Sequence, residues 1–378
     1  MPLKRILVVR HSTRLDTKDL SWRDTSPTPY DPPLSQSGIL EAGALGRAIA
    51  SEIAASVDSA ADTAVSAVSV SVRPTRDLSP ASRTSDRSSV GTDSSSALTM
   101  GSSAASASPS TFPSSRPLTV YIHTSPFLRC AMTAHYIAQQ LVSMAPLASS
   151  SASSTVNLKI RIDSFLGEWL TPDYFSSISP PPDDGHTSLA ASSMSWLLSN
   201  GSRNILDLTW PLNAFGLSGQ YGERWKTMYW RFSTGLSNLV ASYAGPATGD
   251  SVVILVTHGA GSNALVGALS ATPILVDFGL ASLSVAVPRR RTDGEDEYSS
   301  VYGYGGEKRN RSGYGLLFDD NISNNTTGSG MDKWDLTRIA DVSHLGLLRG
   351  VKEDEPPRTK MPKFEFRAST SPMVSEYI

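Results

Sequence analysis

Charged and imidazole side chains follow directly on short apolar runs at three places in the sequence. The runs and the groups behind them are Ile6–Val9 with Arg10, His11 and Arg14, Leu118–His123 with Arg129, and Ser251–Thr257 with His258 and Gly259. Such runs are typical of buried parallel strands, whose carboxyl ends form the ligand-binding edge of open α/β sheets. Arginine binds phosphate oxygens bidentately, a glycine turn into a helix exposes N–H groups to an anion, and histidine can attack phosphorus. The sequence therefore predicts a phosphate site around His11.

A carboxyl group follows the next candidate strand. Residues 157–163, NLKIRID, alternate apolar and polar side chains as a half-buried strand does, and Glu168 comes shortly after them. An alcohol that leaves a phosphoryl group needs a proton, which a carboxyl group at the same sheet edge can supply as general acid. Glu168 is the candidate for that role.

Helices are expected to alternate with these strands. Ser35 is the predicted N-cap of a first helix, and further helices are predicted over 129–144, from Gly222 onward and over 263–270. Further strands are predicted over 282–287, 313–318 and 334–339. This alternation indicates one three-layer α/β/α domain with a mostly parallel central sheet, over residues 1–349.

Low-complexity tracts interrupt this pattern. The apolar fraction is 39%, below the usual 45–50%, and tracts rich in Ser, Ala, Gly and Pro dilute it. Insertions without a core of their own are predicted at about 51–116, 145–156, 176–200 and 288–330, with a flexible tail at 350–378.

Charge and cysteine content narrow the classes of partner. The net charge is −2 and the pI is near 6.3, so the overall charge does not favour binding to nucleic acid or to an anionic membrane. Cys130 is the one cysteine, which excludes an internal disulfide. The opening apolar run is too short for a signal peptide, and no run approaches the ~20 residues of a membrane span. We therefore expect a cytoplasmic or nuclear protein.

Several short motifs, in a shared order, resemble those of the histidine phosphatase superfamily, in its phosphoglycerate mutase-like branch. RHSTRLD, residues 10–16, is similar to the pattern RHGERxD of the phosphatases that carry a ubiquitin-associated and SH3 module. The other similarities are residues 31–38 to DxPLTxxG, 125–134 to SPxxRCxQTA, 167–169 to FEW, 222–224 to a GES-containing helix, and His258-Gly259 to a second histidine after a strand. Together they span most of the chain outside its insertions.

The resemblance implies a phosphoglycerate mutase-like fold and a role for each matched residue. His11 would take the phosphoryl group, with Glu168 protonating the leaving oxygen and His258 assisting. The phosphate would be bound by Arg10, Arg14, Arg129, His258 and Gly259. It implies a metal-independent phosphomonoester hydrolase without a cofactor, acting on a phosphorylated small molecule or a phosphoprotein. The oligomeric state stays open, a homodimer included.

Ser12 is the departure from the family pattern, which has glycine there. Glycine accepts a positive φ and a close backbone approach, so serine at this position puts the pocket geometry in question. The alternative to an enzyme is a catalytically weak or inactive protein of this fold, acting as an interaction partner or as a subunit of a complex.

Other residues have plainer interpretations. One stretch resembles a dinucleotide-binding fingerprint, with Gly259, Gly261 and Ala264 followed by Asp277. A dinucleotide site would leave Arg10, His11 and Arg129 unexplained. His123, His135 and His344 are predicted to be structural, His186 to be inert, and Cys130 to be a small buried residue. The histidines lack the spacing of a zinc site.

Overall fold

The computed structural model describes residues 3–68, 118–144, 157–244, 250–289 and 334–349. The chain divides into two compact units: residues 1–54 with 116–378, and residues 55–115. Every described strand, and every residue discussed below as a site residue, lies in the first unit.

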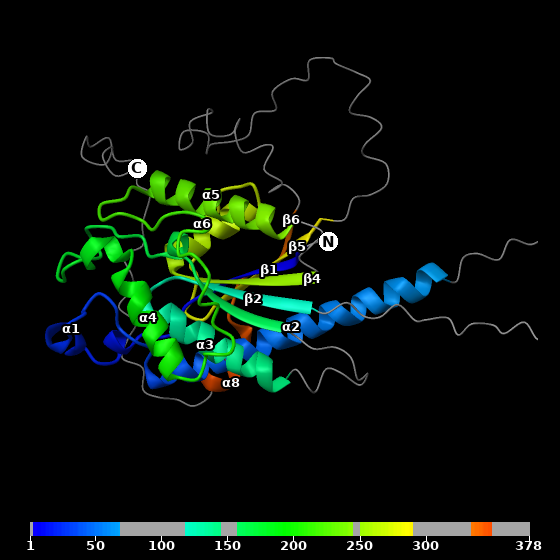
Figure 1. The fold of residues 1–378 in the computed structure, drawn as a ribbon, viewed down its shortest axis with the longest axis horizontal. Helices are drawn as coiled ribbons and strands as arrows, with labels where there is room; N and C mark the ends of the chain where they lie inside the picture. The colour runs from blue at the N-terminus through cyan, green and yellow to red at the C-terminus, as the bar shows by residue number, and fades with distance from the viewer. Residues whose placement is uncertain (1–2, 69–117, 145–156, 245–249, 290–333, 350–378) are drawn as a thin grey trace, which may run out of the picture. The chain divides into compact units, whose positions relative to one another are not determined.

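A six-stranded mixed sheet forms the centre of the first unit, in the order β3-β2-β4-β1-β5-β6 (Figure 1). The strands are β1 (Leu3–Arg10), β2 (Leu118–Thr124), β3 (Asn157–Ile162), β4 (Asp250–Thr257), β5 (Leu283–Pro288) and β6 (Trp334–Asp341). β3, β2, β4 and β1 are mutually parallel, whereas β5 is antiparallel to both β1 and β6. The predicted α/β class with a mostly parallel sheet is confirmed, and β6 is the edge strand predicted from 334–339.

Strand register brings the ends of the three central strands level. The terminal pairs are Arg10 with Thr257, across β1 and β4, and Thr124 with Val256, across β2 and β4. His11, Ser125 and His258 come directly after these positions. Because a one-residue slip would turn every side chain to the other face of the sheet, burial on both faces fixes this register and with it the placement of the three residues.

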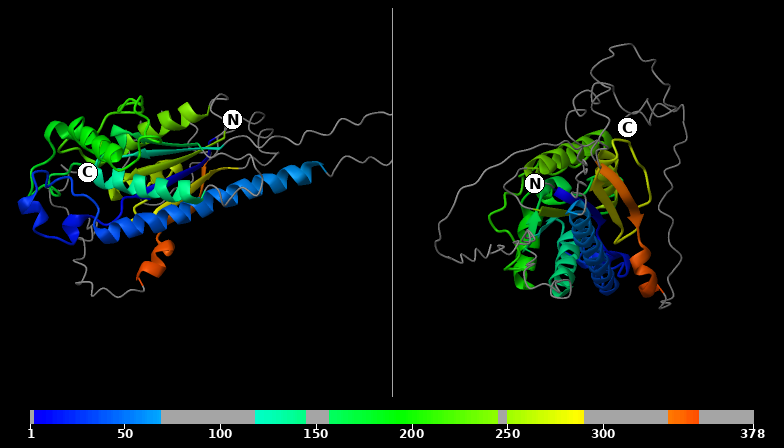
Figure 2. Two further views of the ribbon diagram at one scale, coloured as in Figure 1. Left: turned by 60° about the horizontal axis from the view of Figure 1, so that its bottom comes forward. Right: turned by 90° about the vertical axis from the view of Figure 1, so that its right-hand side faces the viewer.

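Helices cover both faces of the sheet (Figure 2). They are α2 (Gln36–Val68), α3 (Leu128–Met144), α4 (Ser188–Ser199), α5 (Trp225–Tyr243) and α6 (Gly259–Leu269), with the short α1 (Trp22–Thr25) and α8 (Gly346–Arg349). Alternation along β1 feeds two cores: Leu7 and Val9 pack with α2 and α3, while Ile6 and Val8 pack with α5 and α6. The three-layer arrangement is therefore observed.

The start of α2 follows the sequence prediction, whereas that of α6 differs. The Ser35 hydroxyl accepts the Gly38 N–H at 3.0 Å, which is the expected N-cap bond. α6 begins at Gly259, not at 263, with His258 as its N-cap residue. Gly261 is needed inside this first turn, because a Cβ there would lie 2.5 Å from the Phe232 ring of α5. The glycines that obscured the helix in the sequence are what allow it to pack.

Two of the predicted low-complexity insertions contain helices. α2 continues to Val68, well into the predicted 51–116 insertion, because alanine, the best helix former, recurs through that stretch. α4 lies within the predicted 176–200 loop, and Leu189, Ser193 and Leu197 are buried on one face of it at intervals of four residues. The 145–156 insertion, the strand expected at 313–318 and the 350–378 tail lie outside the described residues, as does nearly all of the 288–330 insertion.

The dinucleotide-binding alternative does not fit the topology. Residues 273–277 are not a strand, and β5, which follows α6, is antiparallel to β1 and is not a neighbour of β4. A dinucleotide site needs a parallel crossover at that point.

Among the described residues, no helix is both long and apolar enough to cross a membrane.

Candidate active site

His11 lies buried at the carboxyl end of β1 with its ring orientation fixed by a backbone bond. The backbone N–H of His11 donates to the Thr257 carbonyl at 2.9 Å, and the ring atom Nδ1 lies 2.8 Å from the Ser12 carbonyl oxygen. A carbonyl oxygen only accepts, so Nδ1 carries the proton and Nε2 carries the lone pair. Burial, and then the positive charge of Arg129, hold the pKa of His11 well below its usual value. His11 is therefore a neutral imidazole with a nucleophilic Nε2.

Three arginines gather around His11: Arg10 and Arg14 come from β1 and the loop after it, and Arg129 comes from α3. Arg10 donates to the Phe278 carbonyl and lies against Gly259, where a Cβ would be in ordinary contact with the guanidinium at 3.4 Å. Arg14 is held through Nε by the Asp16 carboxylate at 2.9 Å and through Nη1 by the Tyr174 hydroxyl at 2.5 Å. Burial lowers the pKa of Arg10, but an arginine stays protonated in proteins.

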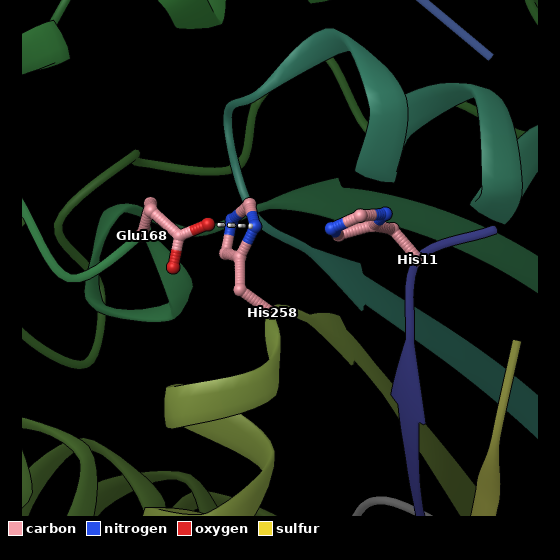
Figure 3. A group of neighbouring side chains, drawn as sticks. All are labelled: His11, Glu168 and His258. Carbon is pink, nitrogen blue, oxygen red and sulfur yellow. Dashed lines mark ion pairs between the residues drawn. The ribbon is translucent and has the colours of Figure 1, made fainter. Parts of the chain in front are cut away.

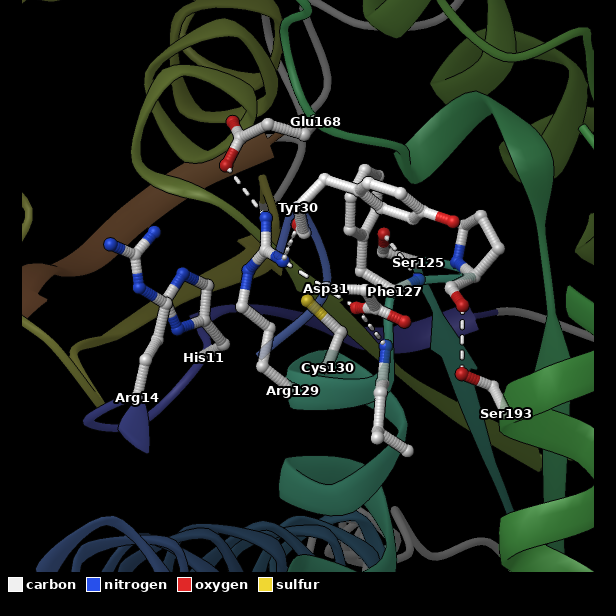
Figure 4. Close-up of polar contacts among 12 residues, drawn as sticks. His11, Arg14, Tyr30, Asp31, Ser125, Phe127, Arg129, Cys130, Glu168 and Ser193 are labelled. Carbon is white, nitrogen blue, oxygen red and sulfur yellow. Dashed lines mark hydrogen bonds and ion pairs between the residues drawn. The ribbon is translucent and has the colours of Figure 1, made fainter. Parts of the chain in front are cut away.

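Arg129 is fully buried and reaches across the site from α3 (Figure 4). Its Nη2 lies 3.2 Å from Glu168 Oε2, its Nη1 lies 3.6 Å from Asp31 Oδ1, and the guanidinium stacks 4.3 Å from the centre of the Phe127 ring. Burial alone would lower the pKa of Arg129, but its neighbours, the two carboxylates among them, raise it. A buried, permanently charged guanidinium thus stands beside the two histidines.

His258 and Glu168 form a hydrogen-bonded pair opposite His11 (Figure 3). His258 Nδ1 lies 3.0 Å from Glu168 Oε2, and His258 Nε2 lies 2.8 Å from the Ser125 hydroxyl. The His258 ring meets the His11 ring edge-on, with centroids 5.4 Å apart. Burial lowers the pKa of His258 to about 4 despite the nearby carboxylate, so the ring is neutral, with Nδ1–H donating to Glu168 and Nε2 accepting from Ser125.

Glu168 is ionised in this arrangement. Burial alone would raise its pKa, but the hydrogen bond from His258 and the charge of Arg129 hold the pKa well below the ordinary carboxyl value. To act as the predicted general acid, Glu168 would have to gain a proton when a substrate binds. A bound phosphate dianion would offset the guanidinium charge that keeps this proton away.

Ser12 is completely buried beside His11 and is not among the described residues with positive φ. Its N–H donates to the Thr133 hydroxyl at 3.2 Å, and its own hydroxyl is buried without a hydrogen-bond partner among the described groups. The backbone at this position therefore does not require glycine. What serine adds is one unsatisfied hydroxyl, not a strained loop.

Two side-chain donors of the site have no partner among the described residues. Arg10 Nε and Arg129 Nε are buried and hydrogen-bond no other described group. By contrast, the N–H groups of His11, Ser12, Thr13 and Leu15 are all bonded within the protein. From the loop after β1, an oxyanion would therefore be held by side chains and not by these four N–H groups.

His11, Glu168 and His258 also have the donor atoms of a metal site, with one ligand atom from each within 4.8 Å of the others. Two imidazoles and a carboxylate are a known zinc ligand set. The neighbouring charges oppose a cation, because the buried guanidinium of Arg129 shares the same carboxylate oxygen. The residues present fit an anion better than a divalent metal.

The structure brings together the predicted residues Arg10, His11, Arg14, Arg129, Glu168 and His258, but the residues that orient them were not predicted from the sequence. Ser125 binds His258, Asp31 lies beside Arg129, and Tyr174 binds Arg14. Ser125 and Asp31 lie within matched motifs, which was the available signal, whereas no pattern in the sequence marks Tyr174. His123 and His135 are buried and hydrogen-bond to Asp163 and Ser202, as predicted for structural residues. Cys130 is the small buried residue that was predicted, but its Sγ lies 3.6 Å from His258 Nε2 and so contacts a site residue.

No protein-family model matches the sequence, and no curated protein matches it. Among solved structures, the ecdysone phosphate phosphatase from Bombix mori, in complex with tungstate, is 15% identical over 85% of this chain and 99% of that chain, with a TM-score of 0.42. A mycobacterial glucosyl-3-phosphoglycerate phosphatase is 16% identical over 76% of this chain and 92% of that chain, with a TM-score of 0.33. Bacillus stearothermophilus YhfR is 14% identical over 75% and 90%, with a TM-score of 0.33. Because these TM-scores lie below 0.5, the site is assigned from this chain's own residues.

Proposed function

We propose that this protein hydrolyses phosphate monoesters through a phosphohistidine intermediate on His11, without a metal, as a member of the histidine phosphatase superfamily. The observation that carries the proposal is the neutral His11, whose Nε2 lone pair stands inside a cluster of three arginines. A nucleophile and a site for its phosphoryl target are thereby combined. The motif similarities at residues 10–16 and 125–134 point the same way.

Arg10, Arg14 and Arg129 bind the phosphoryl oxygens of the substrate. Their positive charges neutralise the dianion and stabilise the charge that spreads over the equatorial oxygens during transfer. His258 can donate a further hydrogen bond to the phosphoryl group through Nδ1–H, when its ring turns so that this N–H leaves Glu168. Since the three arginines are held by protein contacts before substrate arrives, they need little reorganisation during the reaction.

In the first step His11 Nε2 attacks phosphorus, the N–P bond forms, and the bond from phosphorus to the ester oxygen breaks. Glu168 gives its proton to that oxygen, which leaves as an alcohol. In the second step Glu168 accepts a proton from water, whose oxygen attacks phosphorus as the N–P bond breaks. Inorganic phosphate is released and takes away the proton that the ester brought to Glu168, so that both residues return to their starting forms.

The test is turnover of an aryl phosphate by the purified full chain in the presence of EDTA. We expect turnover that EDTA leaves unchanged and that His11→Ala abolishes. His135→Gln is the matched control, since that buried histidine bonds Ser202 and Gln139 on the α3 side and should leave turnover intact. Loss of activity with EDTA, or activity that survives His11→Ala, would overturn the mechanism.

Trapping gives a second line of evidence. Acid-labile label from a radioactive phosphate ester should appear on the wild-type chain after rapid quenching, and should be absent from His11→Ala. A Glu168→Gln chain should accumulate more label from an ester with a good leaving group, because its first step needs no proton while its second step has lost the base. Label on any residue other than His11 would contradict the assignment.

A further inference from the structure

Three consecutive carbonyl groups precede Glu168, and each accepts a hydrogen bond from a side chain of another element. Arg231 of α5 donates through Nη1 to the Phe165 carbonyl at 2.7 Å and to the Gly167 carbonyl at 3.2 Å. Thr257, at the end of β4, donates its hydroxyl to the Leu166 carbonyl at 2.7 Å. The segment that leads into Glu168 is thus fixed at every peptide.

The residue after Glu168 is tied to the same group. Arg231 forms a bidentate pair with Glu223, with Nη2 to Oε2 at 2.7 Å and Nε to Oε1 at 3.0 Å. The Trp169 indole N–H in turn donates to the Glu223 backbone carbonyl at 2.6 Å. One ion pair therefore holds the chain on both sides of Glu168.

This pair is buried and closely packed. The Arg231 side chain is 8% exposed and the Glu223 side chain 4%. Gly219 covers it, since a Cβ there would lie 2.5 Å from Glu223 Oε2 and 2.7 Å from Arg231 Nη2. Neither Arg231 nor Glu223 takes part in the chemistry proposed for the site. Their two parallel hydrogen bonds nevertheless make a strong, geometrically defined contact that is shielded from water.

We propose that the Arg231–Glu223 pair is a positioning device for Glu168, which sets the carboxyl group at the distance from the leaving oxygen that proton transfer requires. The inference rests on the proposed function of Glu168 as general acid. Arg231 and Glu223 are positioning residues: they act on the reaction only through the backbone of residues 165–169. Proton transfer needs heavy atoms at hydrogen-bond distance, so a small displacement of this segment is costly.

The consequence is a dependence on the leaving group. An ester with a good leaving group departs without help from an acid, whereas an alkyl phosphate depends on the proton from Glu168. We expect Arg231→Lys, which keeps the charge but cannot bond Glu223 and two carbonyls together, to lower kcat/KM for an alkyl phosphate by about tenfold to a hundredfold. For 4-nitrophenyl phosphate we expect kcat/KM within about threefold of wild type, because kcat/KM reports only the steps up to departure of the leaving group, and we expect inhibition by phosphate to be unchanged.

Two further variants separate this role from a loss of folding. Thr257→Val removes only the bond to the Leu166 carbonyl and should show the same leaving-group pattern, more weakly. Glu52→Gln is the matched control: Glu52 pairs with Arg5 and Arg338, away from the carboxyl edge, and its side chain is 13% exposed. It should lower the melting temperature without changing kcat/KM for the alkyl phosphate or for 4-nitrophenyl phosphate.

Hydrogen–deuterium exchange provides a readout that does not depend on turnover. Amides of residues 165–169 should exchange faster in Arg231→Lys than in wild type or Glu52→Gln. Equal losses of kcat/KM on both substrates, a parallel loss of phosphate affinity, or unchanged exchange in this segment would overturn the positioning role. An inactive wild type, or one indifferent to His11→Ala, would instead count against the proposed function, and the exchange result would still stand by itself.

Discussion

His11 and Glu168 both have lowered pKa values, and the two shifts have opposite meanings for catalysis. For a histidine, a lowered pKa keeps the nucleophile neutral as the solution becomes acidic. For a carboxyl group, a lowered pKa keeps the general acid ionised until a proton is supplied. In the proposed reaction, the nucleophile His11 is therefore neutral throughout the neutral pH range, whereas Glu168 still needs a proton.

From this we predict that kcat/KM rises as the pH falls from about 8 to about 5, because phosphate monoesters take up their own proton near pH 6 and bring it into the site. His258, with a pKa of about 4, stays neutral over that range. The measurement is a pH profile of kcat/KM for an alkyl phosphate, with Glu168→Gln as control. That variant should be slower and should lose most of this pH dependence. A profile that rises toward alkaline pH would contradict the assignment.

Ser12 supports a second prediction. Ser12→Ala removes a buried hydroxyl without a partner, so we expect it to raise the free energy of unfolding by about 1 kcal/mol while kcat stays within about threefold. Urea unfolding and steady-state kinetics measure the two effects.

Ser12→Gly is the matched variant for the same position. It removes the same hydroxyl and adds backbone freedom, so its stability should fall below that of Ser12→Ala by about 0.5–1 kcal/mol. A gain in kcat for glycine that alanine does not share would instead support the alternative of a weakly active interaction subunit, in which serine restricts the loop.

At the scale of the elements, two glycines three positions apart in α2 have opposite roles. A Cβ on Gly46 would lie 2.8 Å from Gln140 Cβ and 3.0 Å from the Ile137 backbone, whereas a Cβ on Gly43 would meet only the end of the flexible Arg47 side chain at 3.8 Å. Gly46 is a close contact between α2 and α3, and Gly43 is not.

We therefore predict that Gly46→Ala destabilises the protein by about 1–3 kcal/mol, since backbone cannot yield as a side chain does. Gly43→Ala should stabilise it by about 0.5–1 kcal/mol through helix propensity. Thermal or urea unfolding of the two variants against wild type is the measurement. Equal effects of the two substitutions would show that the close α2–α3 contact does not decide stability.

The strands and helices also explain why part of the candidate site could be predicted from the sequence. Ile6–Val9 and Ser251–Thr257 are apolar enough to be recognised as buried parallel strands, and the residues after such strands meet at one edge whatever the helices do. The antiparallel β5 and the helix α4 carry weaker signals, since Ser and Ala read as loop while Leu189 and Leu197 supply the buried face. Partners such as Tyr174 depend on how distant loops fold together, which no local pattern encodes.

At the scale of the whole molecule, the site belongs entirely to the first compact unit. Arg10, His11 and Arg14 come from before residue 55, and Arg129, Glu168 and His258 from after residue 115. No side chain of the second unit is required by the proposed reaction.

We predict that replacing residues 69–115 by a flexible Gly/Ser linker of about 20 residues, which spans up to about 70 Å, leaves the site intact. Circular dichroism melting should give a midpoint within a few degrees of wild type, and kcat should be unchanged. A chain that melts normally but loses turnover would show that the 69–115 segment contributes to catalysis.

The hydrogen bonds of the loop after β1 have a consequence for how the specificity of this protein can change. The N–H groups of His11, Ser12, Thr13 and Leu15 are all bonded inside the protein, so none of these four is left to bind an anion. The positive charges around His11 come from arginine side chains, which point mutation can change without changing the fold. Replacing one arginine would lower the charge of the pocket by a single unit and shift its preference from dianions toward monoanions such as sulfate esters. The same scaffold could therefore be redirected to a new class of ester one residue at a time.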